Sequence, residues 1–148
     1  MIFLTVATVL SMGLMIGTEF SVSAFINPAL WKLDEVPREH AVRLFAAKLG
    51  RVMPFWYVGN FLLLAAETIL LRNQPSYLLL ALACAVWVAV IVLTLLFLVP
   101  INNRLARPHA DMRLNEAHRQ HRRWDAMHRA RVVALSAAFV LLLLAIHS

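Results

Sequence analysis

A single carboxylate interrupts the apolar opening of the chain. Glu19 lies in the stretch GTEFSVSAFINP, residues 17–28, and is the only charged residue within residues 2–26. An ionisable side chain in such surroundings is costly unless it is paired or faces a polar cavity, so by default it is a functional candidate. Proton transfer is the chemistry for which a carboxylate in this position is suited.

Three side chains near the start of the last apolar stretch share one helical face. In the sequence WDAMHRAR, Trp124, His128 and Arg131 are spaced by four and three residues. Residues at these spacings are neighbours on the surface of a helix. Trp124 alone would be an ordinary interfacial aromatic, and Arg131 alone an ordinary anchor at the membrane surface. Their alignment with His128, near the expected depth of Glu19, favours a shared cavity.

Asparagines are expected at the same depth. Asn102 and Asn103 lie in the stretch VPINNRLARP, where they either cap a helix end or provide amide groups to a site. Asn60 lies at a comparable depth in the second apolar stretch. We therefore predict that Asn60 faces Glu19.

The second apolar stretch carries one polar stripe. Trp56, Asn60 and Glu67 are separated by four and seven residues, which places them on one side of a helix. We predict that this stripe points into a helical bundle. Glu67 lies five residues before Arg72, near the end of the stretch, and a structural or solvated role is favoured for it.

A group of possible metal ligands occupies one quadrant of the helix that leads into the last stretch. Its members follow one another at spacings of three, four and three residues: His118, His121, Asp125 and His128. These residue types bind transition metals, but arginines lie among them, and their positive charge opposes cation binding. We therefore favour a solvated basic helix. A haem ligated by His40 or His128 is a further alternative, although no spacing requires it.

The composition places these residues in a membrane. The chain has 148 residues, of which 61% are hydrophobic and 15% charged, and its mean hydropathy is +0.73. Soluble domains are less apolar than this. Cys84 is the only cysteine, so an intrachain disulfide is excluded.

Four apolar stretches are long enough to cross a bilayer, which takes about 20 residues as a helix. The predicted spans are residues 2–26, 52–71, 76–99 and 130–147. The last is short in apolar residues, but Arg131 can snorkel and extend it. We predict an all-α fold, an integral membrane four-helix bundle that forms a single domain over residues 1–148.

The basic residues predict the orientation. Residues 27–51 and 101–131 hold thirteen of the fourteen Lys and Arg residues, and Arg72 is the exception. Positive loops face the cytoplasm, so both termini should lie outside, and the expected location is a bacterial inner membrane. The net charge of +6 is thus a topology signal, and nucleic acid is not an expected partner.

Both cytoplasmic connections should contain helical extensions. Asp34 before Pro37 predicts a helix start, and Pro54 predicts a break or kink after a short interfacial helix. From His109 to the C-terminus there is neither Gly nor Pro. A continuous helix of about 40 residues, or ~60 Å, is therefore expected there.

Small residues mark a possible contact between subunits. They repeat every four residues along the first span, at Gly13, Gly17 and Ser21. Such ridges allow close helix approach in membranes, so a homo-oligomer through this face is one prediction.

The polar stretches taken together resemble a known family. The order GTEFSVSAFINPAL, FAAKLGRVMP, PINNRL and WDAMHRAR is similar to that of the anthrone oxygenase-like integral membrane proteins. The resemblance implies a small four-helix protein. For the few characterised members it also implies oxygenation of anthrone-type polyketides to quinones, without an established cofactor. Carried over position by position, it points to Glu19, Asn102, Asn103, Arg104, Trp124, His128 and Arg131.

An anthrone has an acidic C–H in the same ring as its aromatic ketone, and its anion can pass an electron to O2 directly. Such a site needs a base, donors for an oxyanion and a dry aromatic pocket. We assign His128 as base and Glu19 as its orienting or proton-accepting partner. The expected donors are Arg131 and Asn103. The expected substrate-binding residues are Trp56, Asn60, Asn102, Arg104 and Trp124.

Two other functions stay open. One is a haem- or metal-binding membrane redox protein of the same architecture, whereas the favoured oxygenase requires neither group. The other is a small transporter or structural subunit in which Glu19 and Glu67 relay protons. The second is disfavoured because the polar residues cluster at one depth instead of tracing a route across the bilayer.

Overall fold

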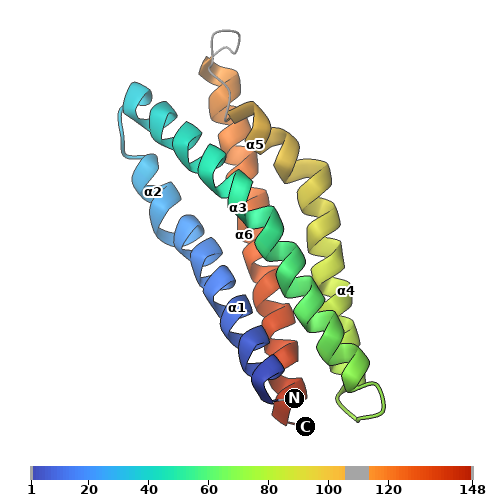
Figure 1. Cartoon of the computed structure of the whole chain (residues 1–148). Coiled ribbons are helices and arrows are strands. Elements are labelled where there is room, and N and C mark those ends of the chain that lie inside the picture. The colour runs from blue at the N-terminus through green and yellow to red at the C-terminus, as the bar shows by residue number, and fades with distance from the viewer. Residues whose placement is uncertain (1, 106–113, 148) are drawn as a thin grey trace.

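The computed structural model describes residues 2–105 and 114–147, with side chains for residues 2–104 and 119–147. Within these ranges the chain is helical, without strands, and folds as four long helices (Figure 1). The elements are α1 (Ile2–Ser21), η1 (Val22–Ile26), α2 (Asn27–Leu30), α3 (Glu35–Leu70), α4 (Tyr77–Leu93), η2 (Thr94–Leu98), α5 (Val99–Leu105) and α6 (Leu114–His147). The predicted all-α fold is confirmed.

All four helices are long and apolar enough to cross a membrane. The candidate spans are Ile2–Leu30, Glu35–Leu70, Tyr77–Arg104 and Arg119–His147. Large apolar side chains also cover the outer surface, where Phe3 is 87% exposed and Phe55 is 79% exposed. Helices that are apolar on their outer face as well as their inner face are typical of a protein whose solvent is lipid. The chain is a multi-pass membrane protein.

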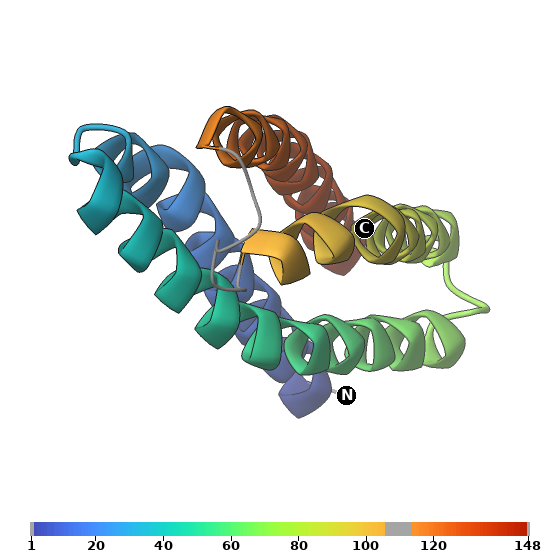
Figure 2. The same cartoon turned by 90° about the horizontal axis from the view of Figure 1, so that it is seen from above.

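The helices form a closed ring. α1 packs against α3 and α6, and α4 packs against the same two helices. Figure 2 shows this order from above. The two ends of the chain lie near the turn 71–76, whereas the connection 31–34 lies at the opposite end of the bundle (Figure 1). Which end faces the cytoplasm stays a prediction from the basic residues.

An apolar core fixes how the helices face one another. Its fully buried side chains come from all four helices: Met12, Met15, Leu64, Trp87, Leu135 and Leu142. Because packed side chains interdigitate at near-crystalline density, they set the rotation of each helix about its axis. That rotation decides which polar residues point inward.

Two helices widen into π-helical turns just before a proline. η1 ends two residues before Pro28, and η2 ends two residues before Pro100. In each, the residue before the proline donates its N–H to the carbonyl five residues earlier. A proline ring clashes with the carbonyl four residues back, and a wider turn accommodates that clash. Both helices therefore continue past their prolines.

Three local predictions need correction or restriction. α3 runs unbroken through Pro54, so no separate interfacial helix precedes the second span. Asn102 and Asn103 lie inside α5, so they do not cap a helix end. α6 begins at Leu114, and residues 109–113 of the predicted long helix lie outside the described residues.

The small residues along the first helix differ in what they contact. A Cβ placed on Gly13 would lie 3.7 Å from Phe139 Cζ of the same chain, whereas one on Gly17 would meet nothing within 4 Å. Ser21 donates its hydroxyl to the Gly17 carbonyl at 2.8 Å. Part of the ridge is thus used within the bundle, and self-association through it stays a prediction.

Candidate active site

The carboxylate of Glu19 is buried and fully engaged. The residue is 1% exposed at the end of α1. Its Oε2 accepts a hydrogen bond from Arg131 Nη2 at 2.6 Å, and its Oε1 accepts one from the Tyr57 hydroxyl at 3.0 Å. A carboxylate inside a span is tolerated when it is paired in this way. Glu19 thus ties α1 to both α3 and α6.

His128 completes this cluster, and its partners define where its protons lie. Nε2 is 3.1 Å from the backbone carbonyl of Glu19, and a carbonyl only accepts, so Nε2 carries a hydrogen. Nδ1 is 2.8 Å from Arg131 Nη2 and 3.1 Å from Glu19 Oε2. The neutral ring therefore accepts from the guanidinium at Nδ1. A protonated ring would instead donate to Glu19, so Nδ1 is the position at which this histidine can receive a proton.

Trp124 holds the imidazole from the other side. The two rings are stacked, with centroids 4.6 Å apart and planes 9° from parallel. The spacing of Trp124, His128 and Arg131 along α6 places all three on one face, which points at Glu19. Stacking and two fixed nitrogens together leave the imidazole little freedom to turn.

A cavity of about 250 Å³ opens beside the cluster. Its lining is mostly apolar, and its polar side chains are Glu19, Tyr57, Thr94, Asn102, Asn103, Trp124, His128 and Arg131. Residues from α1, η1, α3, α4, η2, α5 and α6 contribute. Apolar walls with a few convergent polar groups are typical of a small-molecule site.

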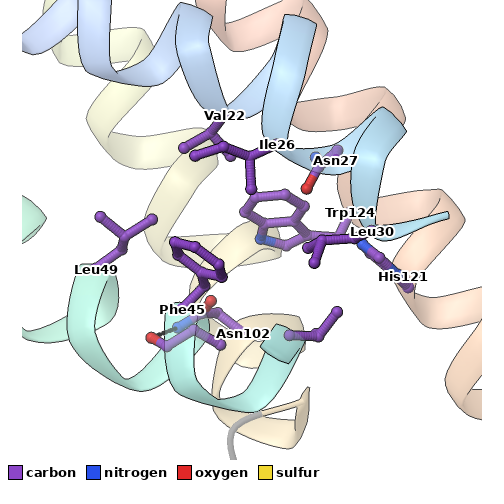
Figure 3. A pocket seen from close by; sticks show the side chains of 11 residues that line it. Val22, Ile26, Asn27, Leu30, Phe45, Leu49, Asn102, His121 and Trp124 are labelled. Atoms are coloured by element: carbon purple, nitrogen blue, oxygen red, sulfur yellow. Dashed lines mark hydrogen bonds between the residues drawn. The ribbon is translucent and has the colours of Figure 1, made fainter. Parts of the chain in front are cut away.

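A smaller pocket of about 40 Å³ shares part of its lining with this cavity. Figure 3 shows the side chains that line the smaller pocket. Trp124 and Asn102 line both spaces, together with Val22 and Leu49. Asn102 is anchored there because its Nδ2 donates to the Ala46 carbonyl of α3 at 3.0 Å. The indole of Trp124 and the amide of Asn102 therefore form part of a shared wall.

Three of the predicted substrate-binding residues do not line the larger cavity. Trp56 donates its indole N–H to the Ser11 hydroxyl at 3.0 Å, and Asn60 donates to Met15 Sδ at 3.2 Å. Both side chains are thus used in contacts with α1. Arg104 is exposed at the end of α5.

Of the two roles expected for Glu67, structural or solvated, burial excludes the solvated one. Glu67 is 2% exposed, and its Oε1 has no hydrogen-bond partner among the described residues. It lies on the same buried face of α3 as Asn60, whose Oδ1 is also unpartnered there.

The possible metal ligands are engaged separately. His121 stacks on Trp31 with centroids 4.5 Å apart. Asp125 accepts from Asn27 at 2.8 Å and pairs with Arg129 at 2.9 Å. His40 is exposed and lies 3.2 Å from Arg43, and the side chain of His118 lies outside the described residues. Within the described part of the chain, no group of three or more His, Cys, Asp or Glu side chains could hold a metal ion.

Two site residues were not predicted from the sequence. Tyr57 precedes Asn60 by three residues, so its place on the buried stripe could have been noticed. Thr94 is a hydroxyl in an otherwise apolar segment, six residues before Pro100. The signal in each case was a polar group on a span, which needs a partner or a cavity.

Comparison with curated proteins and with solved structures gives no match. The family model of anthrone oxygenases matches residues 41–141, more than half of the chain. The match includes Tyr57, His128 and Arg131 but not Glu19. The chain therefore belongs to the anthrone oxygenase family, as the resemblance of its polar stretches predicted.

Proposed function

We propose that the protein is a membrane-embedded oxygenase of a lipophilic aromatic substrate, of the anthrone or quinol class. The single observation that carries the proposal is the cluster of Glu19, Tyr57, His128 and Arg131 in the wall of a largely apolar cavity. Family membership supports the reaction class. The cavity would take the flat ring system, and the cluster would act at its ketone and its acidic C–H.

The first step is removal of a proton from the carbon opposite the ketone. His128 Nδ1 receives this proton once the Arg131 N–H that it accepts at 2.8 Å turns to the ketone oxygen, and Glu19 stabilises the imidazolium from 3.1 Å. The negative charge moves to the ketone oxygen, where the Arg131 guanidinium and an asparagine amide are the available donors. Trp124, stacked on His128, limits the access of water to the base.

Molecular oxygen is the oxidant. The anion passes one electron to O2, and the resulting radicals combine to form a C–O bond, giving a hydroperoxide once His128 returns its proton. Removal of the second hydrogen from the same carbon, with cleavage of the O–O bond, forms the new carbonyl and releases hydroxide as water. One O2 thus yields one quinone and one water, with one oxygen atom in each.

The position of the cavity supports entry of the substrate from the bilayer. Pro54 and Val58 of α3 and Leu95 of η2 line the cavity and are also exposed on the outer surface. α3 packs against α4 and α5, the elements on either side of η2. An opening toward lipid between α3 and η2 would admit a substrate with low solubility in water.

Turnover by a histidine variant tests the proposal. Protein purified in mild detergent is supplied with an anthrone, and quinone formation is followed by absorbance above the protein-free rate. His128→Ala should abolish turnover and retain the elution volume of the folded protein. The matched control is His147→Ala, because His147 is exposed at the far end of α6. Equal turnover in His128→Ala and the unaltered protein would exclude the assigned role.

A further inference from the structure

Most serine and threonine hydroxyls on the helices of this protein form a hydrogen bond within their own helix. Five described side chains donate to the carbonyl four residues earlier at 2.8–2.9 Å: Thr8, Thr18, Ser21, Thr68 and Ser136. This local bond is the ordinary way for a serine or threonine to sit inside a helix. A threonine that does not use it is therefore an exception that needs a reason.

Thr94 is such an exception. Its Oγ1 is buried and has no hydrogen-bond partner among the described residues. The residue opens η2, where the turn is widened ahead of Pro100, and it lines the large cavity. A buried hydroxyl without a partner costs free energy, and in native proteins such groups are expected to have a function.

A second unpartnered group lines the same cavity. The Nε of Arg131 is buried and has no partner in the described residues, although Nη2 of the same guanidinium is bound to Glu19 and His128. η2 packs against α6, so the two groups belong to facing elements. Thr94 can donate or accept, whereas Arg131 Nε only donates.

We infer that the Thr94 hydroxyl is a specificity-determining group that hydrogen-bonds a ring hydroxyl of the substrate, while Arg131 Nε donates to its ketone oxygen. The inference rests on the proposed function and adds to it the residue that distinguishes a substrate with a ring hydroxyl from one without. The inference rests on two unpartnered polar atoms that belong to residues lining one cavity.

The test compares an anthrone that carries ring hydroxyls with the unsubstituted anthrone. Thr94→Val keeps the branched shape and removes the hydroxyl. It should lower kcat/KM for the hydroxylated substrate about tenfold, mainly through KM, and leave the unsubstituted one nearly unchanged. Thr94→Ser should restore the preference. An unchanged ratio of the two kcat/KM values in Thr94→Val would overturn the inference.

The matched control is Thr68→Val. The Thr68 hydroxyl donates to the Leu64 carbonyl at 2.8 Å and is not among the cavity residues. Thr68→Val should leave the ratio of the two kcat/KM values, for the hydroxylated and the unsubstituted anthrone, unchanged. If Thr94→Val does not fold, Thr94→Ala carries the same comparison, because alanine is the best helix former.

A binding measurement separates this inference from the proposed function. Quenching of tryptophan fluorescence gives the Kd of a hydroxylated anthraquinone and of the unsubstituted anthraquinone. A tighter Kd for the hydroxylated compound that is lost in Thr94→Val supports the inference even if no turnover is found. Turnover of both anthrones without any effect of Thr94→Val would support the oxygenase and overturn the inference. Absence of both binding and turnover would overturn both.

Discussion

Arg131 Nη2 lies 2.6 Å from Glu19 Oε2, although the two residues are 112 positions apart in the chain. The bond joins the first helix to the last at the wall of the cavity. Both side chains are largely buried: 2% of the Glu19 side chain and 11% of the Arg131 side chain are exposed. In such surroundings each charge is tolerated because the other is present.

We predict a strong energetic coupling between these two residues. Glu19→Gln should lower the free energy of unfolding by about 3 kcal/mol, because it leaves a buried guanidinium without its counter-charge. Arg131→Met should be similarly costly, yet the double variant should lose less than the two single losses together. Chemical unfolding in detergent gives the free energy of unfolding of the unaltered protein, the two single variants and the double variant. Additive losses would show that the pair is not coupled.

A second prediction concerns the close approach of α3 and α5. A Cβ added at Gly50 would lie 2.6 Å from Asn102 Nδ2, so Gly50→Ala should displace the amide from the Ala46 carbonyl. We expect a loss of about 1–2 kcal/mol in stability and reduced turnover.

Gly59→Ala is the control for Gly50→Ala. Nothing lies within 4 Å of a Cβ at Gly59, on the same helix. Because alanine is the better helix former, that variant should be more stable by about 0.5–1 kcal/mol. If Gly50→Ala is as stable and as active as Gly59→Ala, close contact with Asn102 does not require glycine at position 50.

The proposed opening toward lipid leads to a third prediction. Val58 is 51% exposed and lines the cavity, so Val58→Trp should narrow the entrance. We expect kcat/KM to fall several-fold with little change in the unfolding temperature. Leu62→Trp is the matched control, because Leu62 is 61% exposed on the same helix and does not line the cavity. Equal effects of the two tryptophans on kcat/KM would contradict entry between α3 and η2.

The orientation of the bundle supplies a fourth prediction. On a background in which Cys84 is replaced by alanine, single cysteines are placed at Arg72 and at Lys48, both exposed positions. A membrane-impermeant maleimide added to intact cells should label the cysteine at position 72 and not the one at position 48. The reverse pattern would show that the termini face the cytoplasm.

Much of the fold could be predicted because it depends on local properties. The length of an apolar stretch predicts a span. The spacing of Trp124, His128 and Arg131 predicts a shared face, whatever the helix packs against. The polar stretches also predicted the family. Glu19, the costly carboxylate, was correctly expected to need partners.

Contacts between helices were harder to predict, because they depend on the rotation and depth of each helix in the assembled core. Asn60 was expected beside Glu19, but it bonds to Met15 one turn away, and Tyr57 takes the place at the carboxylate. The π-helical turns before Pro28 and Pro100 shift the residues that follow them out of a regular α-helical register.

The central claim is that this cavity oxygenates a lipophilic aromatic compound with O2. The most direct measurement is O2 consumption together with quinone formation in one purified sample, with its metal content and absorption spectrum recorded beforehand. The oxygenase account predicts one O2 consumed per quinone, at a rate far above that without protein, and loss of that rate in His128→Ala. A rate equal to the protein-free control would contradict it.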